Sequence, residues 1–391
     1  MKHFDCVVVG GGMVGAASAL SLAQLGLQVA LVEQQEAKSF DKEQALDLRV
    51  SAISLASEQL LEQLEAWQQV IQWRACAYKR LAVWELDPSY TEFSAAEIEQ
   101  THLGHIVENR LIQLSLWQQI NQHENIELFC PESLVDFEQI SEQSLDEVKV
   151  QLSNHTITTK LLIAADGASS QVRQLANIGT TGWDYQQSAM LINVETALPQ
   201  QDITWQQFTP SGPRSFLPLC SLKEEGQGSL VWYDSPRRIK QLCTMTKPHL
   251  RTEILNHFPK ELGDIEVLQF GSFPLTRRHA QSYSNRGCVL VGDSAHTINP
   301  LAGQGVNLGF KDVAALLDIS KEKGELTQSV ARRYEVMRRS DNLMMQSGMD
   351  FFYKTFSNDI GPLKFVRNAA LKLAENSGPI KAQVLKYALG L

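Results

Sequence analysis

Glycines and acids in this chain have the types and spacing that bind a phosphorylated cofactor. Gly10, Gly12 and Gly15 follow an apolar run in the order GxGxxG, and an apolar stretch rich in small residues comes after them. In a strand, turn and helix, the first glycine permits a tight turn, the second lets backbone approach a pyrophosphate, and the third lets helix and strand touch. Glu33 ends the next apolar run, where a carboxylate can bind ribose hydroxyls. Because a carboxylate there repels a 2′-phosphate, the site should hold the ADP part of FAD or NAD and not NADP.

Two acid–glycine pairs later in the chain favour FAD over NAD. Asp166-Gly167 and Gly292-Asp293 each follow a short apolar run that predicts a buried strand. Asp293 can accept hydrogen bonds from ribitol hydroxyls, and Gly292 lets backbone approach a ligand closely. Taken alone, Asp166-Gly167 fits an ordinary turn before a capped helix equally well. FAD needs a second site of this kind because its flavin ring lies far from the first turn, whereas NAD has no use for it.

The segment after Asp293 predicts a loop and the start of a helix. Its sequence over residues 292–313 is GDSAHTINPLAGQGVNLGFKDV, in which a proline fixes the loop and glycines open the helix. The free N–H groups at a helix start can receive a phosphate or the pyrimidine end of a flavin. The residues that we expect to contact the cofactor there are Pro300, Gly303, Gly305 and Asn307.

Together these motifs resemble a known family. GxGxxG at residues 10–15, DGxxSxxR at residues 166–173 and GDxxHxxxPxxGQGxN at residues 292–307 are similar in order and spacing to the single-component flavin aromatic hydroxylases of the para-hydroxybenzoate hydroxylase fold. Within that family, three segments resemble the ubiquinone-biosynthesis hydroxylases: residues 47–54, 103–117 and 273–280. Four more resemble the branch that hydroxylates demethoxyubiquinol: residues 204–219, 230–239, 345–358 and 385–391.

The resemblance implies an FAD-dependent aromatic-ring monooxygenase that hydroxylates a polyprenylated quinol in ubiquinone biosynthesis. FAD would be the cofactor, NAD(P)H or another reductant the transient electron donor, and O₂ the co-substrate, with hydroxylation through a flavin hydroperoxide. The chain has one nucleotide-binding fingerprint, which leaves the choice of reductant open. Three alternatives stay open: a sister hydroxylase acting at another ring position, a flavin enzyme of the same fold that inserts no oxygen, and an assembly subunit that binds other pathway enzymes.

Three further residues have two interpretations each. The resemblance places an FAD-contacting arginine at Arg110, which also fits a surface residue of a helix. Arg49 precedes a small-residue stretch and either lines the flavin pocket or lies in a solvated loop. His296 lies within the last motif and could help deprotonate a ring hydroxyl, because imidazole titrates near neutrality. His296 fits a structural histidine bonded to the loop backbone slightly better.

The elements that must position these residues form an interleaved α/β fold. The resemblance implies a Rossmann-like FAD-binding domain over residues 1–70, 101–180 and 275–345. Residues 71–100 and 181–274 would form a largely antiparallel substrate-binding sheet, in agreement with short alternating strands between Pro, Gly and Asp turns. The remaining residues, 346–391, would form a helical C-terminal tail. Aromatic residues of the substrate sheet could line a pocket, although packing in a sheet core is the default: Trp205, Phe208, Phe216, Trp232 and Tyr233.

The composition excludes several classes of protein. The 391 residues are 43% hydrophobic and 20% charged, which is typical of a folded protein with more than one domain. The net charge of −9 argues against general nucleic-acid binding, which needs a basic excess. Six cysteines without a CxxC pair and scattered histidines indicate neither a metal site nor a disulfide framework, and a reducing cytoplasm fits best.

The C-terminal part is the basic part of the chain. Residues 331–391 carry 10 Lys and Arg against 5 Asp and Glu, a net charge of +5, which leaves −14 over residues 1–330. A helix over residues 363–374 would be apolar on one face and basic on the other, which suits a membrane surface or packing on the protein itself. We therefore expect a cytoplasmic protein with peripheral contact at the inner face of the membrane through its basic C-terminal helices. Its partners would be a membrane-resident quinol and other ubiquinone-biosynthesis enzymes, with oligomerisation left open.

Overall fold

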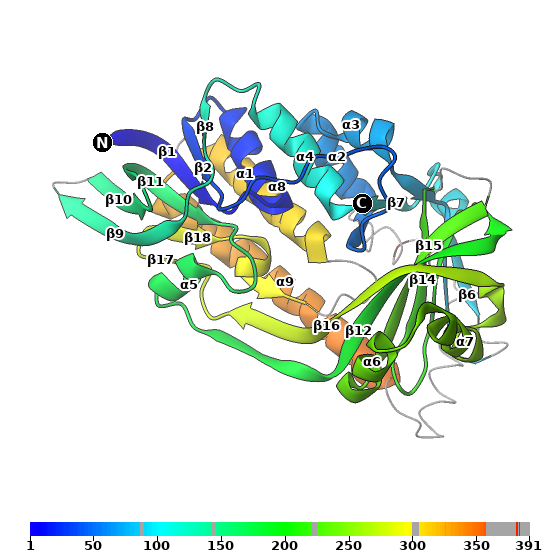
Figure 1. Cartoon of the computed structure of the whole chain (residues 1–391). Coiled ribbons are helices and arrows are strands. Elements are labelled where there is room, and N and C mark those ends of the chain that lie inside the picture. Colours follow the sequence, from blue (N-terminus) through cyan, green and yellow to red (C-terminus); the bar gives the residue numbers. More distant parts are fainter. Residues whose placement is uncertain are drawn as a thin grey trace.

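The computed structural model describes residues 1–86, 90–142, 145–220, 225–298, 305–324, 326–356, 381 and 383 (Figure 1). Three β-sheets and the helices around them make up these residues. One end of the molecule holds a parallel sheet with helices packed on it, and the other end holds a large, mainly antiparallel sheet. This arrangement confirms the predicted α/β fold, in which the parallel sheet is collected from segments far apart in the chain.

Five parallel strands form the centre of the first sheet, in the order β18–β11–β1–β2–β8. Their apolar residues are buried because helices or further strands cover both faces, which is the usual state of a parallel sheet. β17 extends one edge, and β10 and β9 continue antiparallel from β11. The strands of this sheet are β1 (Lys2–Val9), β2 (Val29–Val32), β8 (Ile126–Phe129), β9 (Leu134–Glu142), β10 (Leu145–Leu152), β11 (Thr156–Ala164), β17 (Ser284–Asn285) and β18 (Cys288–Leu290).

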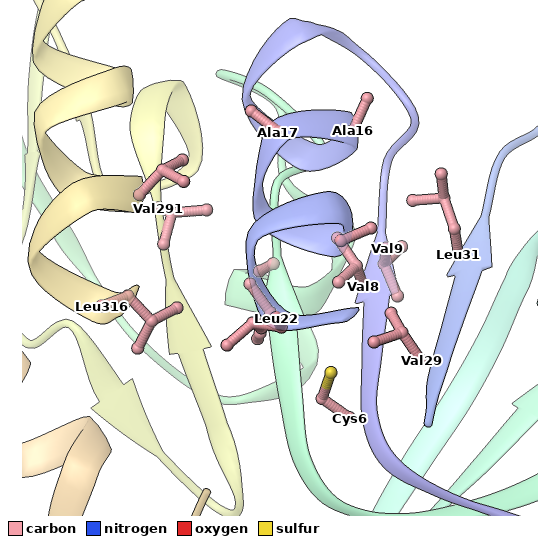
Figure 2. Close-up of a cluster of buried hydrophobic side chains, with 14 of the residues drawn as sticks. Cys6, Val8, Val9, Ala16, Ala17, Leu22, Val29, Leu31, Val291 and Leu316 are labelled. Atoms are coloured by element: carbon pink, nitrogen blue, oxygen red, sulfur yellow. The ribbon is translucent and has the colours of Figure 1, made fainter. Parts of the chain in front are cut away.

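Three helices pack together beside this sheet: α1 (Met13–Ala23), α4 (Asn109–Ile120) and α8 (Gly305–Lys323). Ala16 and Ala17 of α1 are fully buried, and their small side chains let α1 approach the strands closely. Figure 2 shows Leu22 of α1 and Leu316 of α8 among the buried side chains of this core. This packing fixes the start of α1 directly after β1, where the GxGxxG turn lies.

The second sheet has eight strands in the order β19–β16–β12–β15–β14–β13–β5–β6. These are β5 (Arg80–Trp84), β6 (Thr91–Ser94), β12 (Thr180–Pro199), β13 (Ile203–Gln207), β14 (Arg214–Leu219), β15 (Glu225–Asp234), β16 (Ile265–Ala280) and β19 (His296–Thr297). One face is covered by two helices, α6 (Pro236–Cys243) and α7 (Lys247–His257), which pack against β12, β15 and β16. All pairs are antiparallel except β5 with β13.

The strand period of two separates the predicted pocket aromatics onto opposite faces of this sheet. Trp205, Phe216 and Trp232 are buried in the core under α6 and α7, so they pack in the sheet core. Tyr233 is also buried but belongs to a cluster on the other face, together with Val231. Of the core aromatics in β13, β14 and β15, Tyr233 is therefore the one on the face that α6 and α7 leave uncovered.

A small third sheet lies between the two large ones. Its strands, in the order β3–β7–β4, are β3 (Val50–Ser54), β7 (Gly104–Glu108) and β4 (Cys76–Tyr78), and two helices follow closely in the chain: α2 (Leu55–Gln63) and α3 (Trp67–Trp73). Ile106 of β7 packs in one cluster with Leu219 of β14. The third sheet therefore joins the nucleotide end of the molecule to the antiparallel sheet.

The 29-residue helix α9 (Gln328–Phe356) connects the two ends on another side, drawn in orange in Figure 1. It packs on α8 and β17, and near its other end Asp350 pairs with Arg277 of β16 at 2.9 Å. No helix among the described residues is long and apolar enough to cross a membrane. The remaining elements are short: α5 (Gln171–Leu175), η1 (Ala95–Ile98), η2 (Lys260–Leu262) and η3 (Gly292–Ser294).

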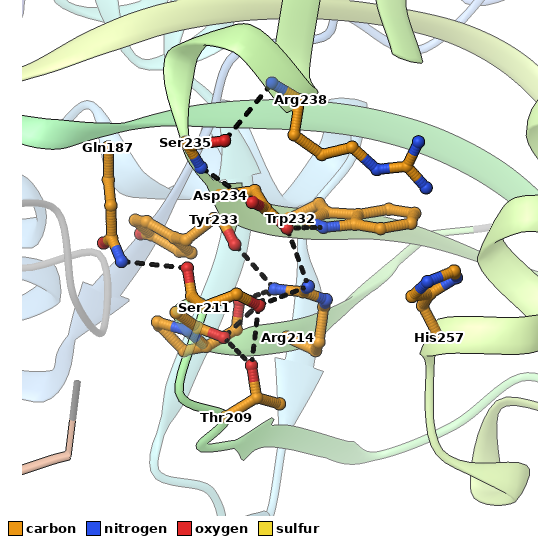
Figure 3. A network of polar contacts seen from close by, with 12 residues as sticks. Gln187, Thr209, Ser211, Arg214, Trp232, Tyr233, Asp234, Ser235, Arg238 and His257 are labelled. Carbon is orange, nitrogen blue, oxygen red and sulfur yellow. Dashed lines mark hydrogen bonds and ion pairs between the residues drawn. The ribbon is translucent and has the colours of Figure 1, made fainter. Parts of the chain in front are cut away.

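A buried arginine stabilises the corner where β14 follows the loop after β13 (Figure 3). The Arg214 side chain is 3% exposed, and its guanidinium donates hydrogen bonds to the backbone oxygens of Tyr233 at 2.6 Å and Gly212 at 3.0 Å. It lies 4.7 Å from the centre of the Trp232 ring and pairs with Asp234 at 3.3 Å. Burial lowers the pKa of Arg214 to about 10, and Asp234 opposes that shift.

Replacing this arginine tests how strongly the corner depends on it. We expect Arg214→Leu to lower the free energy of unfolding by about 2–4 kcal/mol, because buried carbonyl oxygens lose their donors. Arg80→Leu is the matched control: it breaks an ion pair with Asp202 in which each side chain is 43% exposed, and should cost less than about 1 kcal/mol. Urea unfolding of both variants measures the difference. Equal losses would contradict the importance of the buried network.

Candidate functional site

The sequence motifs meet at one edge of the parallel sheet. The GxGxxG turn follows β1, Glu33 follows β2, Asp166 follows β11, and Gly292 lies just after β18. These four strands are neighbours and run parallel, so their carboxyl ends lie side by side. Ligands of open α/β sheets bind in the crevice beyond such ends. The structure therefore brings the GxGxxG turn, Glu33 and the two acid–glycine motifs, from three distant segments, to one continuous edge.

The turn after β1 requires glycine at two positions. Gly10 has a φ of +103°, a conformation that other residues rarely adopt. A side chain on Gly15 would place its Cβ 1.8 Å from the backbone oxygen of Gly10. The first turn of α1 can therefore lie against the end of β1 only because neither residue has a side chain.

The start of α1 is open and positive in character. No side chain caps it, and no acid lies in its first turn, so its free N–H groups face outward. A Cβ added to Gly12 would meet no atom within 4 Å in the part of the chain that the structure describes. This combination of free donors and open space fits a pyrophosphate at the helix start.

Glu33 lies beside that turn. Its Oε2 accepts a hydrogen bond from the Gly11 N–H at 2.6 Å, and its Oε1 accepts from the N–H groups of Gln34 and Gln35 at 2.8 and 3.1 Å. An ionised carboxylate offers about four acceptor positions, so one remains for a ribose hydroxyl. The backbone thus orients the carboxylate, and the assignment of Glu33 to a ribose is compatible with its position.

Asp166 contributes an acceptor without a partner to the same edge. Its Oδ2 accepts from the Val172 N–H at 3.0 Å and so stabilises the start of α5. Its Oδ1 is buried and has no hydrogen-bond partner among the described residues. A buried acceptor of this kind is costly unless a donor reaches it, and a hydroxyl of a bound cofactor can be that donor. Gly167, which follows, leaves open space beside it.

Arg173 joins the two acid–glycine motifs to each other. Its guanidinium is mostly buried and donates to the backbone oxygens of Ser294 and Ala168, both at 2.8 Å. The hydroxyl of Ser294 in turn donates to the backbone oxygen of Ala164, at the end of β11. These bonds hold the segment after β18 against the segment after β11.

Asp293 lies in a recess. Its side chain is accessible to solvent, but the protein around it desolvates the carboxylate and raises its pKa, while His296 and Arg49 lower that pKa. A carboxylate that is both accessible and surrounded by protein suits the hydroxyls of a ribityl chain. Arg49 is exposed and near enough to act on Asp293, so both interpretations of Arg49 stay open.

One buried carboxylate organises this segment from behind. Asp312 of α8 is fully buried, and its Oδ2 accepts from the Gly292 N–H at 3.0 Å and from His296 Nε2 at 2.5 Å. Its Oδ1 accepts from Arg338 Nε at 2.8 Å and from Asn342 Nδ2 at 3.1 Å, both on α9. We refer to these five residues as the Asp312 cluster. Burial raises the pKa of Asp312, but His296 and Arg338 outweigh burial and lower it to about 2.

His296 belongs to this cluster. Its ring is 2% exposed, and its Nε2 must carry the proton because an ionised carboxylate only accepts. The ring also lies 6.1 Å from that of Tyr283. The hypothesis that His296 deprotonates a substrate hydroxyl stays a prediction. What the structure places there is a positioning contact to Asp312.

Arg110 and Asn307 bind other parts of the protein. Arg110 makes two hydrogen bonds of 2.8 Å to Asp47 and one to the backbone oxygen of Ser39 at 3.0 Å, so it holds the segment between β2 and β3. Asn307 donates to the Ala52 backbone oxygen at 2.8 Å and thereby ties α8 to β3. Contact of either residue with FAD stays a prediction.

Part of the predicted loop cannot be compared with the structure. Pro300 and Gly303 lie outside the described residues, as does the predicted helix over residues 363–374. Gly305 is the first residue of α8, and a Cβ added there would meet no atom of the described residues within 4 Å. The start of α8 therefore has open space beside it, as the predicted flavin contact requires.

Sequence reasoning missed the residues that support the site from α8 and α9. Asp312 had a signal, because it lies in an otherwise apolar helical stretch and a buried acid needs partners. Its partners Arg338 and Asn342 had none, since both lie in a helix rich in polar residues.

Sequence reasoning also missed a group of three side chains near α2. Glu58 accepts from His105 Nδ1 at 2.7 Å and from His102 Nε2 at 2.9 Å. The hydroxyl of Thr101 bonds the other nitrogen of His102 at 2.8 Å. One ring nitrogen of each histidine bonds the carboxylate in this arrangement, so the group carries no metal assignment.

Comparison with known proteins identifies relatives of the whole chain. Residues 3–340 match the family described as FAD binding domain. The chain is 48% identical to the 3-demethoxyubiquinol 3-hydroxylase of Escherichia coli strain K12, covering 99% of this chain and 98% of that protein. It is 30% identical to the ubiquinone hydroxylase UbiL of Rhodospirillum rubrum, covering 100% of this chain and 90% of that protein.

Solved structures share the fold at lower identity. The p-nitrophenol 4-monooxygenase PnpA of Pseudomonas putida DLL-E4 has a TM-score of 0.76 at 19% identity, covering 100% of this chain and 97% of that one. The probable FAD-dependent monooxygenase pqsL of Pseudomonas aeruginosa has a TM-score of 0.77 at 18% identity, covering 94% of this chain and all of that one.

Two glycine substitutions distinguish a role in the fold of the turn from a role in binding the cofactor. Gly12→Ala should leave the fold intact but weaken FAD binding at least about tenfold, because its methyl group enters the space where a pyrophosphate would lie. Gly15→Ala should destabilise the protein itself, since its Cβ overlaps the Gly10 oxygen. Gly348→Ala, which also meets no atom within 4 Å, is the control. Isothermal titration of the FAD-free protein measures affinity, and unchanged binding by Gly12→Ala would contradict the pyrophosphate assignment.

The pKa of Asp312 predicts how acid weakens the cluster. Its pKa falls from 3.8 in the unfolded chain to about 2 in the folded one, so its contribution of about 2 kcal/mol is fully present above pH 3.8 and is lost as the pH falls through about 2. At pH 7, Asp312→Asn should lower the free energy of unfolding by about 3–5 kcal/mol, because it breaks the buried ion pair between Arg338 and Asp312, although Arg338 keeps its ion pair with the partly exposed Asp341. Urea unfolding should show this deficit shrinking by about 1 kcal/mol between pH 7 and pH 3. A constant deficit would contradict the assignment.

Proposed function

The chain belongs to the FAD-binding domain family, and we propose that it hydroxylates the aromatic ring of demethoxyubiquinol, a polyprenylated quinol of ubiquinone biosynthesis. It is an FAD-dependent aromatic-ring monooxygenase. When bound, FAD supplies the redox chemistry that activates O₂. The protein's own residues hold the cofactor, position the substrate ring and keep water away.

The observation that carries this proposal is the continuous edge formed by the ends of β2, β1, β11 and β18. The start of α1 offers free N–H groups to a pyrophosphate, and Glu33 offers an acceptor to the ribose. Asp166 and Asp293 lie farther along the same edge, where a ribityl chain would pass. An edge that spans four strands suits a cofactor longer than ADP, which supports FAD.

The antiparallel sheet offers an apolar wall for the substrate. On the face that α6 and α7 leave uncovered, β12, β14 and β15 carry Leu191, Leu217 and Tyr233 in one apolar cluster, against which Met349 of α9 packs. Such a wall suits a quinol ring and the first part of a prenyl chain. By excluding water, it would protect the reactive form of the cofactor from wasteful discharge.

The names of the relatives support the choice of substrate. The Escherichia coli protein is named for demethoxyubiquinol, and a relative in Danio rerio, 29% identical over 98% of this chain and 89% of that protein, is a mitochondrial ubiquinone biosynthesis monooxygenase. We assign hydroxylation at the 3-demethoxy position to this chain because the Escherichia coli relative is 48% identical to it over nearly the whole length. NAD(P)H is the proposed reductant and O₂ the co-substrate.

The domain limits and the cellular setting are part of the proposal. The parallel sheet supports an FAD-binding domain over residues 1–70, 101–180 and 275–345, and the antiparallel sheet supports a substrate domain over residues 71–100 and 181–274. Residues 346–391 would form the tail. We place the enzyme in the cytoplasm, peripheral to the inner face of the membrane and beside other enzymes of the pathway.

Labelled oxygen tests the reaction directly. The purified FAD-loaded protein is given a short-chain demethoxyubiquinol, NADH or NADPH, and isotopically labelled O₂. We expect one labelled atom in a new ring hydroxyl at the one unsubstituted ring position, next to the methoxy-bearing carbon, as mass spectrometry and NMR of the product would show. The Gly12→Ala variant, with less FAD, should form correspondingly less product.

Each other outcome has a definite meaning. A labelled hydroxyl on a related quinol, with none on demethoxyubiquinol, would overturn the substrate and favour a sister hydroxylase. Product without label would overturn the monooxygenase reaction. FAD-depleted protein that still restored ubiquinone synthesis in cells would favour an assembly role.

A further inference from the structure

The outward face of α9 is unusually apolar for a protein surface. Among the described residues, 14 large hydrophobic side chains are exposed, and five of them lie on this one helix. They are Val336, which is 77% exposed, Met344 at 59%, Met337 at 49%, Leu343 at 43% and Phe351 at 68%. Spacings of seven residues, from Val336 to Leu343 and from Met337 to Met344, keep them on one side of the helix. Contiguous apolar patches of this kind mark interaction surfaces.

The charges around this apolar face are basic. Arg332, Arg333 and Arg339 are exposed on the same part of α9, and Arg333 pairs with Glu322 of α8 at 2.6 Å, so Arg332 and Arg339 carry the basic character of this face. The acids of the helix are engaged elsewhere: Glu335 accepts from Ser284, for example, with its Oε2 2.7 Å from the hydroxyl. The outward face therefore combines apolar side chains with arginines, the pattern of helices that lie in the surface of an anionic membrane.

The other two acids of α9 also have partners in the protein. Asp341 pairs with the buried Arg338, and Asp350 pairs with Arg277 at 2.9 Å. Asp350 therefore directs its charge toward β16, and the charge of the partly exposed Asp341 is balanced by Arg338 of the same helix. What remains outward has a net positive charge, which complements anionic lipid headgroups.

The inward face of the same helix supports the cofactor segment. Arg338 and Asn342 bond Asp312, and Gln346 donates to the backbone oxygens of Arg278 and Thr297, at 3.0 and 3.1 Å. Thr297 follows the Gly292-Asp293 motif directly in β19. A helix with its side chains is about 10–12 Å across, so the apolar face lies within about one helix diameter of the cofactor segment.

We propose that the outward face of α9 is a docking surface for the anionic surface of a lipid bilayer. The inference rests on the proposed substrate, because a polyprenylated quinol resides in the bilayer and must reach the flavin from there. Apolar side chains would enter the boundary between headgroups and acyl chains, and the arginines would contact the phosphates. Binding in this way needs no membrane-spanning helix.

Vesicle flotation tests the surface. The FAD-loaded full chain is mixed with vesicles of phosphatidylglycerol and phosphatidylcholine or of phosphatidylcholine alone, and the bound fraction is measured. The triple variant Val336→Ser, Leu343→Ser and Met344→Ser should bind the anionic vesicles at least about tenfold more weakly than the unmodified protein. Arg332→Gln with Arg339→Gln should weaken anionic binding by about fivefold for each arginine and leave neutral vesicles unaffected.

The control is Val135→Ser, because Val135 is also an exposed apolar residue, at 46%, but lies on another element, β9. It should bind as the unmodified protein does. Flavin absorbance of each variant checks that the fold and cofactor are retained. Turnover of a water-soluble short-chain quinol should stay unchanged in the triple variant, whereas turnover of a long-chain quinol in vesicles should fall with binding.

Three results would overturn the proposal. They are absence of vesicle binding by the unmodified protein, equal binding by the triple variant, and a dimer in sedimentation that the triple variant converts to monomer, which would assign the face to a second copy of the chain. Flotation needs no substrate, so its result is separate from that of the hydroxylation assay. Vesicle binding without demethoxyubiquinol hydroxylation would remove the proposed substrate and keep the surface.

Discussion

Four donors, two on α9 and two in the segment after β18, converge on one fully buried carboxylate, that of Asp312. An isolated charge in that position would be very costly, so the carboxylate is stable only while all four donors stay in place. The Gly292 N–H fixes the start of the second acid–glycine motif, and His296 fixes its end. Arg338 and Asn342 attach both to α9. The geometry of the cofactor edge therefore depends on a buried contact that lies behind it.

A second constraint comes from the close approach of backbone to backbone. Gly10 and Gly15 let α1 begin against the end of β1, and Val14 of the same turn packs where a side chain on Gly309 would lie, 2.5 Å from an added Cβ. α1 and α8 can thus cross near their starts, which places two helix N-termini beside one sheet edge. Because both ends are positive in character, the edge as a whole favours an elongated anionic ligand.

The parts of the fold that could be predicted are those that depend on residues close together in the sequence. The turn at Gly15 lies within a contiguous strand, turn and helix, and each later acid–glycine pair directly follows its own apolar run. Which acid pairs with which arginine could not be predicted for residues far apart in the sequence. Many acids are available to each arginine, and only the packing of the folded chain selects one of them, as it selects Asp47 for Arg110. The sequence also did not show which face of the antiparallel sheet each side chain occupies. Neighbours such as Trp232 and Tyr233 look alike in the sequence, and only the position of α6 and α7 decides which one meets a core and which one faces the remaining space.

One face of α9 supports the cofactor segment and the other face forms part of the molecular surface. The helical period of α9 explains how one helix can do both. Side chains three or four residues apart share a face, so Arg338, Asn342 and Gln346 point inward while the apolar residues between them point outward. A ligand shifts a protein's conformation only if it binds two states differently. The Asp312 cluster is buried and its hydrogen bonds are complete, so contact of the outer face with lipid offers no second state to select. A membrane bound there would therefore act by bringing a dilute, bilayer-held quinol close to the flavin, through local concentration and without reshaping the site.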